Sequence, residues 1–274
     1  MMDAMTVMKW PLLACLLLPG LLVYLGLHIV RREIIFVDLG LAQVAALGNC
    51  VAILLGHDHH DWHMYALSVG FTIVGAAIFT LTRNKAGRVP QEALIGIVYV
   101  VAAALGILLL SGNPEGNEAL RRTLVGEVLL VQPGEVGSTF VLYAVVAAVH
   151  FAFRKKFLTL SFGPELQGTT SFSIGWWDFL FYALFGLVVT SFVQIGGVLL
   201  VFSYLIVPAA CANFLARSLG AMLAVGWVTA TAASVVGLYG SYALDLPTGA
   251  AIVCALGAFL LVSGGLASFQ MRSR

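Results

Sequence analysis

Long apolar segments follow one another along almost the whole chain, and each is long enough to cross a lipid bilayer. A crossing takes about 20 largely apolar residues, and only helices or closed barrels satisfy their backbone hydrogen bonds inside the hydrocarbon core. The composition agrees, because 61% of the residues are hydrophobic and 10% are charged, whereas soluble domains carry about 25% charged residues. The sequence therefore predicts an all-α, polytopic membrane bundle of about nine transmembrane helices, at residues 10–30, 34–55, 64–82, 91–111, 136–153, 177–193, 197–216, 219–241 and 248–268.

The loops between these segments are short, so we expect residues 1–274 to form a single transmembrane domain. Positive charge near the ends of membrane spans resists translocation and therefore stays in the cytoplasm. This rule predicts an N-terminus outside and a C-terminus in the cytoplasm. Eleven of the fourteen Lys and Arg residues lie on the side expected to be cytoplasmic: Arg31, Arg32, Arg83, Lys85, Arg88, Arg154, Lys155, Lys156, Arg217, Arg272 and Arg274.

The sequence has no motif of a self-sufficient enzyme or ATPase. A GxxxxGK[ST] phosphate loop, an HExxH metalloprotease motif and a GxSxG nucleophile elbow are all absent. The net charge is +1 and there is no basic tail, so we expect no nucleic-acid partner. If ATP drives transport, the nucleotide must bind another chain, and the inner loop at residues 160–168 offers a dock with turn residues around a short helix.

A polar cluster follows the second apolar segment, on the side expected to face outward. Imidazole nitrogen and carboxylate oxygen are suitable ligands for a borderline transition metal such as zinc. The cluster therefore predicts capture of metal before entry, although a solvated polar turn would have the same composition. Its candidate ligands are His57, Asp58, His59, His60, Asp61 and His63.

The second apolar segment itself contains Asp38 and Gln43. Ionisable groups inside the membrane are costly and mark candidate functional positions. For Asp38 the alternatives are a metal ligand, a helix cap and an interfacial partner of Arg31 or Arg32. For Gln43 they are a position on the translocation path and a hydrogen bond between helices.

Several segments share their order and spacing with one family of membrane proteins. These segments are residues 31–38, 41–48, 93–97, 124–131, 163–166, 196–210 and 245–249. Over most of its length the chain thus resembles the membrane-spanning permease of metal-uptake ATP-binding-cassette importers, the family that brings zinc, manganese or iron into bacteria. One departure concerns the second span, where the family has Asp and His four residues apart. Aligned on Gly48, Leu39 and Gln43 occupy those two positions, which leaves a chelated metal or another solute as further substrates.

The resemblance implies a multi-pass protein of the bacterial cytoplasmic (inner) membrane that works as a homodimer within the lipid. It implies a cytoplasmic ATP-binding-cassette ATPase that carries the ATP, an extracytoplasmic metal-binding protein, and no cofactor of the chain's own. The coupling segment for the ATPase would be Gly163, Pro164, Glu165 and Leu166. We therefore expect a non-enzymatic permease of an ATP-driven importer for a divalent metal, with zinc favoured by the His-rich loop. The alternative is a secondary transporter driven by an ion gradient, which normally needs more ionisable residues deep in its spans.

Overall fold

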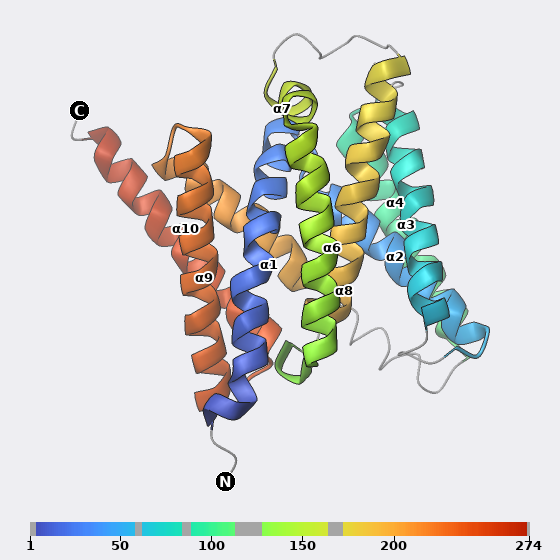
Figure 1. Cartoon of the computed structure of the whole chain (residues 1–274), viewed down its shortest axis with the longest axis horizontal. Coiled ribbons are helices and arrows are strands. Elements are labelled where there is room, and N and C mark those ends of the chain that lie inside the picture. Colours follow the sequence, from blue (N-terminus) through green and yellow to red (C-terminus); the bar gives the residue numbers. More distant parts are fainter. Residues whose placement is uncertain (1–3, 58–61, 84–88, 113–127, 164–171, 273–274) are drawn as a thin grey trace. The chain divides into compact units, whose positions relative to one another are not determined.

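The computed structural model describes residues 4–57, 62–83, 89–112, 128–163 and 172–272. Within these ranges all regular secondary structure is helical, as Figure 1 shows, and the predicted all-α fold is confirmed. The helices are α1 (Ala4–Arg32), α2 (Val37–Leu54), α3 (Trp62–Arg83), α4 (Gln91–Leu110), the 3₁₀ helix η1 (Val128–Leu130), α6 (Pro133–Ala152), α7 (Arg154–Phe162), α8 (Phe172–Leu215), α9 (Leu219–Leu244) and α10 (Thr248–Arg272).

Eight of the described helices are long and apolar enough to cross a membrane, so the predicted multi-pass bundle is confirmed. One of these eight, α8, consists of two helical stretches that meet at a kink, and it contains residues 177–193 and residues 197–215, so two of the nine expected segments are counted here as one. Its apolar part runs for 41 residues, about 62 Å at 1.5 Å per residue, or about twice the thickness of a hydrocarbon core. The helix is interrupted at Gly197, where φ is 73° and ψ is 165°, and this interruption falls between the two expected segments.

The chain forms two compact units whose segments alternate along the sequence. Unit 1 contains Met1–Val30, Val125–Ala144 and Ile195–Arg274, and unit 2 contains Arg31–Leu124 and Val145–Gln194. The chain passes from one unit to the other within α1, α6 and α8. Neither unit is one continuous stretch of the sequence. The single domain expected over residues 1–274 stays a prediction.

In unit 2, α2 packs against both α3 and α4. A Cβ atom at Gly48 would lie 2.8 Å from the Cα of Ser68, so α2 and α3 approach closely at this glycine. The Ser68 hydroxyl donates a hydrogen bond of 3.0 Å to the carbonyl of Ala45, and the hydroxyls of Thr72 and Thr190 lie 2.8 Å apart. Small residues and such hydrogen bonds stabilise contacts between helices in a bilayer. Lipid tails are as apolar as the helix surfaces, so burial of those surfaces contributes little free energy.

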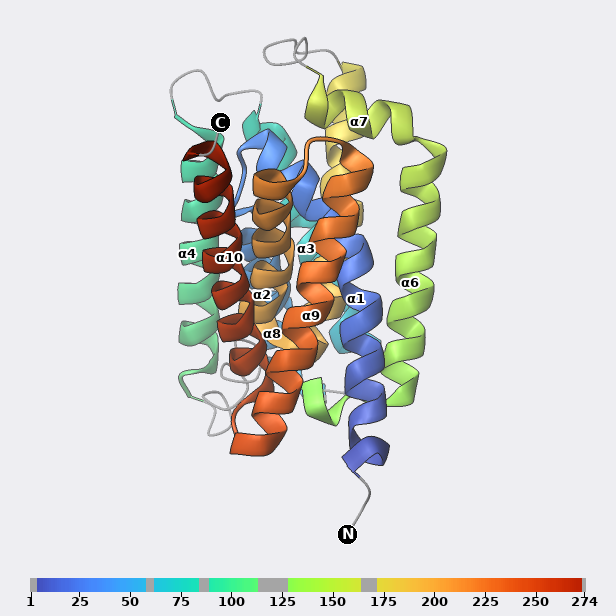
Figure 2. The same cartoon turned by 90° about the vertical axis from the view of Figure 1, so that its left-hand side faces the viewer.

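In unit 1, α9 and α10 form an antiparallel pair joined by a short turn, visible in Figure 2. Ser218 caps the start of α9 by accepting a hydrogen bond from the amide of Ala221. The helix ends at Asp245, which has a left-handed conformation with φ 53° and ψ 46°. The Ser241 hydroxyl then donates to the carbonyl of Leu246 at 2.7 Å and lies 2.8 Å from the Thr248 hydroxyl, which fixes the start of α10.

The loop after α6 begins with a short helix, α7, which turns sharply away from the end of α6 (Figure 2). Phe157 of α7 is fully buried. Its ring stacks on His150 near the end of α6, with the two ring centroids 4.2 Å apart. The helix ends at Gly163, whose amide donates to the carbonyl of Thr159 at 2.9 Å. This packing holds α7 as part of unit 2.

Candidate functional site

Asp38 lies in the first turn of α2 and is only 1% exposed. Neither of its carboxylate oxygens has a hydrogen-bond partner within the described part of the chain. Arg32, one of its expected partners, binds Asp178 instead. A helix N-terminus favours a negative charge, but a buried carboxylate without a partner is costly unless a cation or a proton joins it. Asp38 is therefore a position where a cation or a proton would be stabilised.

Gln43 is also buried, at 6% exposure. It lies on the same helix, and α2 continues without interruption from Val37 to Leu54. Because five residues of a regular helix rotate a side chain by about 140°, Asp38 and Gln43 point in different directions from α2. The structure thus buries both predicted positions but does not bring them together as a chelating pair.

Asn49 is a half-buried polar position that the sequence reasoning missed. Its Oδ1 atom has no hydrogen-bond partner among the described residues. Eleven residues separate it from Asp38, which on a regular helix places both on nearly the same face, about 20° and 16 Å apart. Ala42 and Ala45, buried at 1% and 2%, lie between them on this face. The spacing of 38, 42, 45 and 49 is the signal that could have revealed this stripe.

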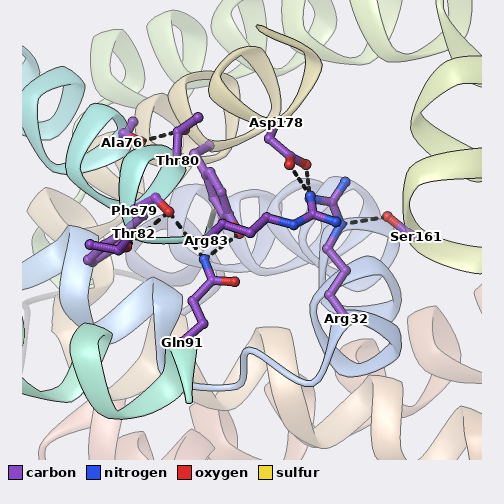
Figure 3. Close-up of polar contacts among 10 residues, drawn as sticks. Arg32, Ala76, Phe79, Thr80, Thr82, Arg83, Gln91, Ser161 and Asp178 are labelled. Atoms are coloured by element: carbon purple, nitrogen blue, oxygen red, sulfur yellow. Dashed lines mark hydrogen bonds and ion pairs between the residues drawn. The ribbon is translucent and has the colours of Figure 1, made fainter. Parts of the chain in front are cut away.

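Arg32, Arg83 and Asp178 form an ion cluster at one end of unit 2 (Figure 3). The Asp178 Oδ1 atom lies 3.1 Å from Nη1 of Arg32, and its Oδ2 atom pairs with Nη1 of Arg83. The Arg32 Nε atom donates a hydrogen bond of 2.8 Å to the Ser161 hydroxyl. Beside the cluster, the Gln91 amide donates to the carbonyl of Phe79 at 3.2 Å. Ends of α1, α3, α4, α7 and α8 therefore meet at these polar contacts.

Asp178 was also missed from the sequence, where it was counted only as part of an apolar segment. Its side chain is 2% exposed, and those of Arg32 and Arg83 are 6% and 24% exposed. A single acid in the first turns of a membrane helix, on the side that carries most of the arginines, is the signal that could have found it. The cluster holds two positive charges and one negative charge.

The predicted outer metal cluster lies only partly in the described chain. Asp58, His59, His60 and Asp61 are outside the described residues. His57 and His63, which flank them, lie with their ring centroids 4.7 Å apart and their planes nearly parallel, at 15°. Within the described ranges no group of three or more His, Cys, Asp or Glu side chains could hold a metal ion. Metal binding by this loop stays a prediction.

The predicted coupling segment begins at the end of α7. Gly163 is described there, whereas Pro164, Glu165 and Leu166 lie outside the described residues. Ser161 lies two positions before this segment, and its hydroxyl accepts a hydrogen bond from Arg32. The segment therefore starts from a helix end that is fixed to the ion cluster.

These features define a multi-pass helical membrane protein with ionisable groups buried inside its spans, the class in which such groups mark transport pathways. The chain belongs to the ABC 3 transport family, whose family model matches residues 4–266. It is thus a membrane-spanning permease, the transport subunit of that family, and the resemblance seen in the sequence is confirmed.

Curated relatives cover most of the chain. The manganese transport system membrane protein MntC of Listeria monocytogenes is 31% identical over 196 residues, which are 69% of each chain. The manganese import system permease protein ScaB of Streptococcus parasanguinis is 26% identical over 91% of this chain and 86% of its own length. A probable iron transport system membrane protein of Haemophilus influenzae is 26% identical over 69% of this chain and 67% of its own length.

Solved structures share the fold. The structure described as PsaBC from Streptococcus pneumoniae in complex with Fab matches with a TM-score of 0.77 and 25% identity, over 94% of this chain and 90% of the matched chain. An inward-facing conformation of a putative metal-chelate type ABC transporter matches with a TM-score of 0.71 over 98% of this chain and 90% of that one. Its 17% identity supports the fold alone.

Proposed function

We propose that this chain is the permease of an ATP-driven importer for a divalent transition metal in the bacterial cytoplasmic membrane. The observation that carries this proposal is Asp38, a buried carboxylate without a hydrogen-bond partner in the described chain, inside a span of a transport-family protein. A passing cation would supply the missing partner. Asp38 and Gln43 would both line the translocation path, at different angles around α2.

Manganese is the transported ion that we favour. Three polar side chains of α2 offer oxygen donors: the buried Asp38 and Gln43, and the half-buried Asn49, whose Oδ1 atom is shielded. Carboxylate and carbonyl oxygens suit manganese better than they suit zinc. Several relatives are also named for manganese or iron transport. Zinc, which the His-rich loop favoured, is the second candidate, because imidazole suits zinc and the rings of His57 and His63 lie together.

The partners in this proposal follow from what the chain lacks and from its family. Without a phosphate loop in its sequence, the chain needs a separate ATP-binding-cassette ATPase, which would dock at Gly163, Pro164, Glu165 and Leu166. In this proposal α7 and the C-terminus lie in the cytoplasm and the N-terminus lies outside. A second copy of the chain would complete the path, and an extracytoplasmic metal-binding protein would deliver metal to the loop at His57–His63.

The test is metal uptake into proteoliposomes that contain this chain with the candidate ATPase and enclose ATP. Radioactive manganese and the binding protein are supplied outside, and zinc is added in parallel as a competitor. We expect manganese to accumulate only when both the ATPase and ATP are present. The double variant Asp38→Ala, Gln43→Ala should lose this uptake, because the buried oxygen donors are gone.

Vesicles that contain the permease alone supply the contrasting result. If they accumulate manganese from a proton or sodium gradient without any ATPase, the chain is a secondary transporter and the proposal fails. If zinc accumulates and manganese does not, the importer stands but the choice of ion is wrong. Wild-type uptake by the double variant would remove Asp38 and Gln43 from the path.

A further inference from the structure

The cluster of Arg32, Asp178 and Arg83 connects parts of unit 2 that are far apart in the sequence. Arg32 is the last residue of α1, Arg83 the last residue of α3, and Asp178 lies in the second turn of α8. Each arginine takes one oxygen of the same carboxylate. The Asp178 carboxylate therefore joins the ends of α1 and α3 to α8 at this cluster (Figure 3).

Arg32 also fixes this cluster to α7. Its Nε atom donates to the Ser161 hydroxyl at 2.8 Å, and its guanidinium carbon lies 3.9 Å from the ring centroid of Phe181 in α8. The neighbouring Arg31 lies with its guanidinium carbon 5.7 Å from the ring centroid of Phe162, the last residue of α7. Arg32 thus contacts the helices on both sides of the proposed ATPase dock, and Arg31 contacts the one before it.

The chain links on both sides of the cluster are short. From Arg32 the chain reaches Asp38 through Glu33, which has a left-handed conformation with φ 57°, and through a turn that ends where α2 begins at Val37. On the other side, Ser161 lies two residues before Gly163, where the proposed dock begins. A displacement of α7 or of the start of α8 would therefore move Arg32. Through the short turn after α1, Arg32 would in turn move the start of α2, which carries Asp38.

We propose that the Arg32–Asp178–Arg83 cluster is the coupling element through which ATP-driven movement at the dock reaches Asp38. This inference rests on the proposed function. The three residues are positioning residues, because none of them touches the metal in this account. Their role is to keep the ends of α1, α3, α7 and α8 moving as one body during the transport cycle.

A purely structural role makes a different prediction for Arg83. The cluster has two arginines for one carboxylate, and unbalanced buried charge is unfavourable. Replacing Arg83 with Gln leaves the Arg32–Asp178 pair balanced, so a structural cluster would tolerate or even gain from this change. A coupling cluster would lose its link to α3. Arg83→Gln therefore separates the two roles, and Arg83→Lys is the conservative variant that keeps one charged contact.

The experiment measures manganese transported per ATP hydrolysed in proteoliposomes that contain the permease and its ATPase. For Arg83→Gln we expect this ratio to fall about tenfold, a coupling loss in the usual range for linked sites, while the amount of assembled complex stays unchanged. Arg83→Lys should recover most of the ratio. The matched control is Glu92→Gln, which neutralises a partly exposed carboxylate in the first turn of α4 and should keep the wild-type ratio.

A second variant keeps the test decisive. Arg83→Gln combined with Asp178→Asn has the same net charge as the wild type but lacks the bridging carboxylate, so the ratio should stay low. A wild-type ratio in Arg83→Gln, or its recovery in the double variant, would overturn the inference. A wild-type complex that moves neither manganese nor zinc with ATP would instead overturn the proposed function, so the two failures are distinguishable.

Discussion

Replacing Asp38 with Ala should stabilise the metal-free protein and remove its response to metal. In the wild type the carboxylate is 1% exposed and has no hydrogen-bond partner in the described chain. Alanine at this position carries no charge and no polar atom, and it matches the alanines at 42 and 45 on the same face of α2. The variant therefore removes a buried group whose only suitable partner, in our proposal, is the transported cation.

The magnitude follows from two opposing contributions. An unpaired buried ion costs several kcal/mol, and the position of Asp38 in the first turn of α2 offsets up to about 2 kcal/mol of this through the helix dipole. The metal-free variant should therefore gain about 1–3 kcal/mol, which raises the unfolding midpoint by about 2–12 °C at about 2–4 °C per kcal/mol. Manganese at a hundred times its Kd should stabilise the wild type by about 2.7 kcal/mol and the variant not at all.

The assay is thermal unfolding of the purified permease, followed by tryptophan fluorescence with and without manganese, with magnesium as the comparison ion. The matched control is Glu92→Ala, which removes a carboxylate from the first turn of α4 at a partly exposed position. That control should not gain stability and should keep the response to manganese. A lower midpoint for metal-free Asp38→Ala, or an unchanged rise with manganese, would refute the reasoning.

Two further predictions concern the outer loop and the break in α8. Changing His57 and His63 to Ala together should lower uptake at limiting metal and leave uptake at saturating metal unchanged, because the loop would capture metal without being the transport site; equal uptake at both concentrations would refute this role. Gly197→Ala should lower the unfolding midpoint, because φ of 73° with ψ of 165° costs a residue with a Cβ about 1–3 kcal/mol. Gly96→Ala is its control, since a Cβ there meets nothing within 4 Å, and equal midpoints for the two variants would contradict the strain at Gly197.

The sequence predicted the membrane class of the fold because a hydrocarbon solvent leaves few choices. Apolar runs of sufficient length must become helices there, so composition and segment length were enough to place most spans. The boundary between the sixth and seventh expected segments also fell at the interruption at Gly197. That two helical stretches meet at a kink there follows from the backbone angles of Gly197, and segment length carries no information about such angles.

The candidate site was only partly predictable. Asp38 and Gln43 were found because polar residues are rare in a membrane span. Asn49 was missed because its importance depends on a buried oxygen without a partner, which no residue type reveals. Asp178 was missed for a related reason, since its role comes from Arg32 and Arg83, which lie 146 and 95 residues away in the sequence.

The sequence by itself predicted that this chain crosses the membrane many times and that it resembles a family of permeases. These properties follow from residue types and their local spacing, which hydrophobic thickness and motif chemistry constrain directly. Only the tertiary structure decided which charges are paired and which stay alone. Pairing depends on helix ends that are brought together by packing, so Arg32 binds Asp178, whereas the carboxylate of Asp38, six residues along the chain, has no hydrogen-bond partner among the described residues.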